Sequence, residues 1–179
     1  MAFMELSQAY RYCPVCGQAR QSRTPIRPFR CHACGHTTFF GPVTAVGAII
    51  QNAKGEVLLI ERAKEPGIGK LGMPGGFVDP NEGAEDALRR EVLEEVGITV
   101  GPLEFVSTSP NSYHYHGIDI PVVDIFFSAQ AETHDIEHDT AEVSNWMWTD
   151  LTVEVLDGMA FRSNRLALER FRSKSVPKS

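Results

Sequence analysis

The sequence lacks any hydrophobic run long enough to cross a lipid bilayer. Its longest apolar stretch runs from Val43 to Ile50, whereas a transmembrane helix needs about 20 apolar residues. The first five residues also lack the basic segment, apolar segment and cleavage site of a secretory signal. We therefore expect a cytoplasmic protein that does not associate with membranes. Internal repeats and low-complexity tracts are absent too, which argues against a repeat architecture.

The composition predicts a folded core, and the charged residues are distributed unevenly along the chain. Of the 179 residues, 42% are hydrophobic and 22% are charged, which excludes wholesale disorder. The formal net charge is -6, with +4 on residues 1–40, -15 on residues 41–161 and +5 on residues 162–179. The acidic centre argues against a nucleic-acid groove there and favours a site that attracts cations. The basic ends either complement the acidic centre or contact phosphates.

No cysteine occurs after position 34, and all four cysteines lie in two C-x2-C pairs. The first pair is Cys13 and Cys16, and the second is Cys31 and Cys34. Two such turns supply the four thiolates that a tetrahedral zinc site needs. The pattern resembles a zinc ribbon over residues 1–40. A closed four-ligand site of this kind stabilises folding and takes no part in chemistry.

Other interpretations of this segment stay open. Two disulfides would require an oxidising compartment, and redox C-x2-C pairs usually lie beside a βαβ unit. His32 or His36 is an alternative ligand in place of one cysteine. The five arginines of residues 1–40 keep nucleic-acid binding by the ribbon as a further alternative. We also expect a short hairpin between Arg20 and Arg30.

A second domain is expected from the boundary at Gly41-Pro42 to residue 179. Val43–Ile50 predicts a buried strand that pairs with a second strand, Glu56–Arg62. The loop Pro66–Gly76 contains five glycines, so its backbone can approach a ligand closely.

A helix with clustered carboxylates follows this loop. The apolar period of Ala84–Val96 predicts the helix, and Gly97 ends it. Glu91, Glu94 and Glu95 share one sector of this helix. Clustered like charges raise one another's pKa unless a cation is bound, and hard carboxylate oxygens suit Mg²⁺ or Mn²⁺.

The alternative is a solvated helix that is held by ion pairs. Glu85 with Arg89 and Asp86 with Arg90 have the favourable i,i+4 order. A pair between Arg90 and Glu94 is a further expectation. A helix of this kind would need no metal.

The residues of the loop and the helix together resemble a known motif. Gly76-x5-Glu82-x7-Arg90-Glu91-Val92-x-Glu94-Glu95-x-Gly97-Ile98 is similar to the complete Nudix box. The resemblance implies an α/β fold, the Nudix αβα sandwich around a mixed β-sheet, preceded here by the zinc-ribbon module. It also implies hydrolysis of a diphosphate, in which a divalent-metal cluster polarises the diphosphate and water attacks one phosphorus.

The resemblance carries metal and catalytic roles onto matching residues. The expected ligands of Mg²⁺ or Mn²⁺ are the Gly76 carbonyl, Glu82, Glu91, Glu94 and Glu95. Arg90 is expected to orient Glu91. The general base is Glu91 or, as the second candidate, Glu142 on a later loop.

The expected substrate contacts are Arg62, Phe77, Tyr113 and Tyr115. Arg62 matches a position that often contacts substrate phosphate in the family, and structural pairing is its alternative. Phe77 adjoins the box glycine. Tyr113 and Tyr115 share one face of an extended segment, where they would stack an adenine or pack within the sheet.

The substrate class is implied by the domain order. A zinc ribbon ahead of a Nudix domain resembles NADH pyrophosphatases and FAD- and ADP-ribose-cleaving relatives, but the NADH signature is missing from residues 107–116. We expect cleavage of a nucleoside diphosphate linked to another group, as in NAD(H), ADP-ribose or FAD, to a nucleoside monophosphate and a phosphorylated product.

Two other functions remain as alternatives. The first is hydrolysis of a nucleoside triphosphate, (d)NTP, or a dinucleoside polyphosphate. The second is a zinc-ribbon regulator that binds RNA or protein on a Nudix scaffold. Many Nudix proteins are dimers, so a homodimer is a further implication of the resemblance.

Overall fold

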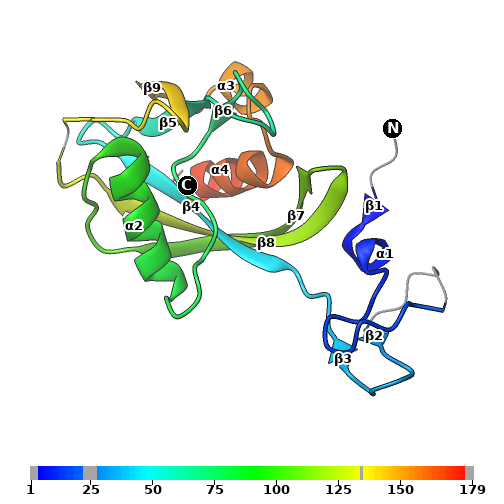
Figure 1. Cartoon of the computed structure of the whole chain (residues 1–179). Coiled ribbons are helices and arrows are strands. Elements are labelled where there is room, and N and C mark those ends of the chain that lie inside the picture. Colours follow the sequence, from blue (N-terminus) through cyan, green and yellow to red (C-terminus); the bar gives the residue numbers. More distant parts are fainter. Residues whose placement is uncertain (1–3, 22–27, 134, 176–179) are drawn as a thin grey trace. The chain divides into compact units, whose positions relative to one another are not determined.

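The computed structural model describes residues 4–21, 28–133 and 135–175, and Figure 1 shows its strands and helices. The strands are β1 (Met4–Glu5), β2 (Phe29–Arg30), β3 (Thr37–Thr38), β4 (Val43–Gln51), β5 (Val57–Arg62), β6 (Leu71–Gly72), β7 (Glu104–Tyr115), β8 (Ile118–Gln130) and β9 (Val143–Thr149). The helices are α1 (Leu6–Ala9), α2 (Ala84–Val96), α3 (Val153–Asp157) and α4 (Arg162–Ser175). None of the described helices is long and apolar enough to cross a membrane.

Most strands join one mixed sheet. Its order is β1-β8-β4-β5-β6, with β7 paired to β8 and β9 paired to β5. β1 is parallel to β8, whereas β5 is antiparallel to β4, β6 and β9. The expected mixed α/β sheet is therefore confirmed.

Helices cover both faces of this sheet, because alternate residues of each strand point to opposite faces. On one face, Ile50 and Leu58 pack with Leu88 of α2. On the other face, Ile49 and Leu59 pack with residues of α3 and α4. Figure 1 shows α2 and α4 on opposite sides of β4. This is the αβα sandwich that the motif implies.

The helix α2 begins and ends where the sequence predicts. Gly83 is its N-cap, and Gly97 adopts a left-handed conformation (φ 70°) and donates its N–H to Leu93 O. The expected pairing of Glu85 with Arg89 is wrong. Arg89 instead donates to the carbonyls of Val100 and Gly101. These hydrogen bonds connect α2 to the segment that follows the helix.

The chain divides into two compact units. The first contains residues up to Val43 together with Ser112–Val122, and the second contains Thr44–Asn111 with Val123 to the end. Within the first unit β1 pairs with the Ile118 end of β8, and β2 pairs with β3. The hairpin expected between Arg20 and Arg30 lies largely outside the described residues.

Candidate active site and metal sites

The glycine-rich loop and helix α2 meet at two buried carboxylates. Glu95 is only 6% exposed, and its Oε2 accepts the N–H of Gly75 at 2.8 Å. A β-carbon at Gly76 would lie 2.5 Å from the Glu91 carboxylate, and one at Gly75 would lie 2.1 Å from Val46 O. Only glycines at both positions allow the loop backbone to lie against the two glutamates.

The two carboxylates are held in an unfavourable electrostatic environment. Burial raises the pKa of Glu95 to about 8, and the nearby charges of Glu91 and Glu142 act in the same direction. Burial also raises the pKa of Glu91, although Arg90 opposes the shift. A cation between the carboxylates would relieve this repulsion. The donor set of hard oxygens therefore fits Mg²⁺ or Mn²⁺.

Arg90 is the centre of an ion-pair network on the same helix. Its guanidinium contacts Glu82 at 2.7 Å, Glu91 at 2.9 Å and Glu94 at 3.0 Å, and it donates to Phe77 O at 3.2 Å. The contact with Glu91 is the one expected of an orienting residue. Glu94 is the most exposed of the three partners, with 60% of its side chain accessible.

Glu82 uses both carboxylate oxygens within this network. Oε2 accepts from Arg90 Nε at 3.2 Å, and Oε1 accepts from Arg90 Nη2 and from the N–H of Asp79. The hydrogen bonds from Arg90, followed by the one from Asp79, lower the pKa of Glu82. The carboxylate thus holds Arg90 in place, a contact that its expected role as a metal ligand did not anticipate.

The loop that carries Glu142 is anchored to the end of α2. Asp139 donates its N–H to Glu95 O at 3.0 Å, and Ala63 donates its N–H to Glu142 O at 2.9 Å. The Glu142 side chain pairs with Lys64, and its charge raises the pKa of both Glu91 and Glu95. Glu142 is therefore electrostatically part of the carboxylate cluster.

Arg62 is fixed by contacts that the sequence did not reveal. Its Nε donates to Pro66 O at 2.8 Å, and its guanidinium carbon lies 5.1 Å from the centroid of the Phe161 ring. The charge of Arg62 lowers the pKa of Glu95. No acceptor is described for either Nη among residues 4–21, 28–133 and 135–175. No sequence pattern near Arg62 indicates its contact with Phe161, because Phe161 lies about a hundred residues further along the chain.

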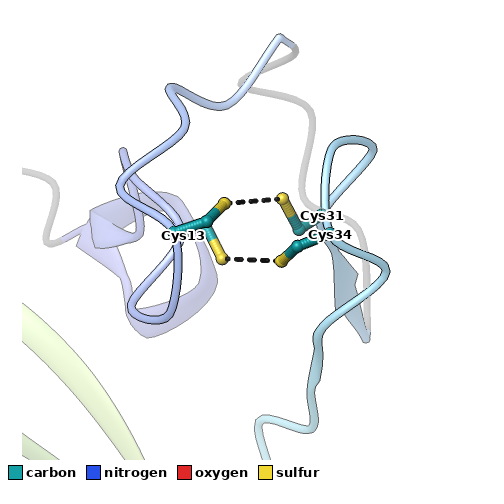
Figure 2. A group of neighbouring side chains, drawn as sticks. Cys13, Cys31 and Cys34 are labelled. Carbon is teal, nitrogen blue, oxygen red and sulfur yellow. Dashed lines mark hydrogen bonds between the residues drawn. The ribbon is translucent and has the colours of Figure 1, made fainter.

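The four cysteines form a second, separate cluster. Their sulfur atoms all lie within 4.8 Å of one another, with Cys13 Sγ 3.7 Å from Cys34 Sγ and Cys16 Sγ 3.6 Å from Cys31 Sγ. Figure 2 shows these two facing pairs. Sulfurs at about 2.3 Å from a tetrahedral ion are about 3.8 Å apart, so the spacing fits a bound ion, as in a zinc ribbon.

The geometry of the cluster bears on two of the alternatives for the cysteines, disulfide formation and a histidine ligand. All four are free thiols, and their sulfurs are too far apart for the disulfide length of about 2.05 Å. His36 hydrogen bonds to Thr38 at 3.1 Å and lies outside the cluster. Backbone N–H groups, that of Cys34 first, lower the pKa of the Cys31 thiol to about 6, whereas burial and hydrogen bonds with the neighbouring cysteines raise the pKa of the Cys34 thiol.

The NUDIX domain model matches residues 41–170. The chain belongs to the NUDIX family. A NAD-capped RNA hydrolase, NudC, of Stutzerimonas stutzeri is 30% identical over 55% of this chain and 35% of its own length. The NudC of Haemophilus influenzae is 26% identical over 79% of this chain and 52% of its own length. The chain thus spans about a third to a half of these curated relatives.

A solved structure gives the same fold for this NUDIX domain. The NUDIX domain of Shewanella oneidensis NrtR, complexed with ADP ribose, superposes with a TM-score of 0.63 at 25% identity. The match covers 77% of this chain and 91% of that one. The family and fold implied by the box residues are confirmed.

The expected substrate contacts lie in different parts of this NUDIX protein. Phe77 directly follows the glycine-rich loop, and its side chain is 41% exposed. Its carbonyl accepts a hydrogen bond from Arg90 of α2. Tyr113 and Tyr115 belong to the first compact unit, where the ring of Tyr115 lies 4.3 Å from that of His116. Their contact with substrate stays a prediction.

Proposed function

We propose that this protein is a divalent-metal-dependent pyrophosphohydrolase. Its substrate would be a nucleoside diphosphate linked to another group, of the NAD(H), ADP-ribose or FAD type. The products would be a nucleoside monophosphate and a phosphorylated remainder. The observation that carries the proposal is the packing of Glu91 and Glu95 against the Gly75-Gly76 backbone, where burial raises both pKa values.

The ligands we propose for Mg²⁺ or Mn²⁺ are Glu91, Glu94 and Glu95, with the Gly76 carbonyl. When bound, such an ion polarises phosphate oxygens and lowers the pKa of a coordinated water. Glu82 was expected to join this set. Its oxygens already accept from Arg90 and Asp79, which supports a positioning role for Glu82.

The other residues of the site would position substrate and move a proton. Arg62 would contact the diphosphate through its two Nη atoms, because Nε is already held by Pro66 O. Arg90 would orient Glu91 through the 2.9 Å contact. We propose Glu91 as the general base and Glu142 as the second candidate, since Glu142 is held beside the cluster by its backbone and by Lys64.

The substrate class is supported by two relatives. The matching NudC proteins are named NAD-capped RNA hydrolases, and the similar NrtR domain was solved with ADP ribose. These ligands share an ADP-type diphosphate. The NudC proteins match although this chain lacks the NADH signature at residues 107–116.

We infer that zinc occupies the four-cysteine site. The Sγ spacings of 3.6 and 3.7 Å support a tetrahedral ion, and thiolate ligands prefer zinc to magnesium. We further infer two domains, residues 1–40 as the ribbon and residues 41–179 as the hydrolase. The family match over residues 41–170 supports this boundary.

The proposal is tested by a substrate panel with magnesium. NADH, NAD, ADP-ribose, FAD and a diadenosine polyphosphate are incubated with wild-type protein, and nucleoside monophosphate release is followed by chromatography. We expect selective cleavage of at least one ADP-linked diphosphate. A nucleoside triphosphate is incubated in parallel, and release of pyrophosphate from it would favour the alternative reaction. Absence of turnover by folded, metal-loaded protein would favour the regulator.

A further inference from the structure

Lys64 and Glu142 lie opposite each other where β5 ends and β9 begins. The two strands are antiparallel neighbours, and their pairing continues past Arg62, because Ala63 donates its N–H to Glu142 O at 2.9 Å. The Lys64 side chain then forms an ion pair with the Glu142 carboxylate. Glu142 is thus held by a backbone contact and a side-chain contact from the same short segment.

The backbone that carries Glu142 is also fixed from the other side. Asp139 donates its N–H to Glu95 O at 3.0 Å, and its carbonyl accepts the N–H of Glu142 at 3.0 Å. The Asp139 carboxylate accepts the N–H of Ala141 at 2.9 Å. Because this loop is already ordered, the ion pair with Lys64 has to fix side-chain rotamers only, which lowers the entropy that the pair costs.

The Glu142 carboxylate lies among charges that repel it. Burial above all, and the charge of Glu142 in addition, raise the pKa of both Glu91 and Glu95, so the three carboxylates are close enough to repel one another. Since 38% of the Glu142 side chain is accessible to water, this repulsion would turn an unpaired carboxylate outwards. Lys64 opposes that rotation, as Arg90 holds Glu91 through its 2.9 Å contact.

A carboxylate that is held beside this cluster can orient the attacking water. A water molecule has two O–H groups, and Glu91, the base proposed above, accepts the proton of one of them. Glu142 can accept a hydrogen bond from the other O–H, which directs the oxygen lone pair towards phosphorus. Orientation of this kind raises the rate of the chemical step and leaves the binding of substrate unchanged.

We propose that Lys64 is a positioning residue of the hydrolytic site, a role that rests on the proposed function. Lys64 holds Glu142 towards the carboxylate cluster, and Glu142 orients the attacking water. An exposed ion pair changes the population of one side-chain arrangement about 2- to 5-fold. Loss of the Lys64 charge should therefore lower kcat about 2- to 5-fold and leave KM unchanged, because the substrate contacts proposed for Arg62 are not altered.

The test compares kcat and KM at saturating magnesium, with the substrate of the panel that wild type cleaves fastest. Lys64→Met should lower kcat about 2- to 5-fold at constant KM, and Lys64→Arg, which keeps the charge, should restore most of the wild-type kcat. The matched control is Lys54→Met, an exposed lysine in the turn between β4 and β5, which should turn over like wild type. The unfolding midpoint shows whether each variant is folded.

A double-mutant cycle shows whether Lys64 acts through Glu142. Glu142→Gln alone should lower kcat more than Lys64→Met does. In the Glu142→Gln background, Lys64→Met should cause no further loss, because the residue through which Lys64 acts has lost its charge.

The outcomes separate this role from the proposed function. An equal loss of kcat from Lys64→Met with and without Glu142 would overturn the positioning role, as would an unchanged kcat of folded Lys64→Met. A change confined to KM would also overturn it, since Lys64 would then be a substrate contact. Absence of turnover by folded, metal-loaded wild type would instead refute the proposed function, and the positioning role with it.

Discussion

Replacement of Gly76 by alanine should slow turnover by moving Glu91. The added β-carbon would lie 2.5 Å from the Glu91 carboxylate, whereas ordinary contact begins at 3.4 Å. The carboxylate or the loop must therefore move by about 1 Å, and a misplacement of this size costs about 100-fold in rate. Gly76 does not have a positive φ, so the clash is the main cost of the change.

The assay compares kcat of Gly76→Ala and wild type at saturating magnesium, with the unfolding midpoint as the test of folding. Gly101→Ala is a matched control, because its added β-carbon has its nearest contacts at 3.7 Å. We expect Gly101→Ala to keep wild-type turnover. A folded Gly76→Ala protein with unchanged kcat would show that catalysis does not depend on Glu91 lying against this loop.

Three further predictions concern stability, the ribbon and Arg62. Burial raises the pKa of Glu95 from 4.5 to about 8, so the folded chain keeps a proton that the unfolded chain releases, and metal-free stability falls as pH rises through this window. Glu95→Gln should remove a penalty of up to about 5 kcal/mol and raise the metal-free unfolding midpoint at alkaline pH. A lower midpoint than wild type would contradict the shift. Removal of zinc with a thiol-compatible chelator should lower the unfolding midpoint more than it lowers kcat, and an unchanged midpoint after verified zinc loss would reject a structural role. Phe161→Leu should raise KM about 2- to 5-fold by removing a cation–π contact, whereas Phe105→Leu, an exposed phenylalanine elsewhere, should not change it.

The local features of the fold could be predicted because their signals are adjacent in sequence. The helix α2 spans Ala84–Val96 as expected, since glycines at both ends and an apolar stripe define it. The residues of the Nudix box and the two C-x2-C pairs are likewise patterns formed by residues that lie close together in the sequence. The two cysteine pairs do come together in one cluster, and Glu91 and Glu95 both lie against the glycine-rich loop.

Contacts between distant segments could not be predicted in this way. Arg89 had a suitable partner four residues away, yet it donates to the carbonyls of Val100 and Gly101, because the segment after α2 turns back along the helix. Likewise, Phe161 meets Arg62 only once α4 has packed on the sheet. The inclusion of Ser112–Val122 in the first unit depends on pairing with β1, a strand of two residues with no distinct pattern.

The central claim is that the carboxylates beside Gly75-Gly76 form a metal-dependent hydrolytic site. The most direct test titrates magnesium against release of AMP from ADP-ribose for wild type, Glu95→Gln and Glu85→Gln, an exposed carboxylate on the same helix. We predict magnesium-dependent turnover by wild type and Glu85→Gln and none by folded Glu95→Gln. Wild-type turnover by Glu95→Gln would contradict this assignment of the site.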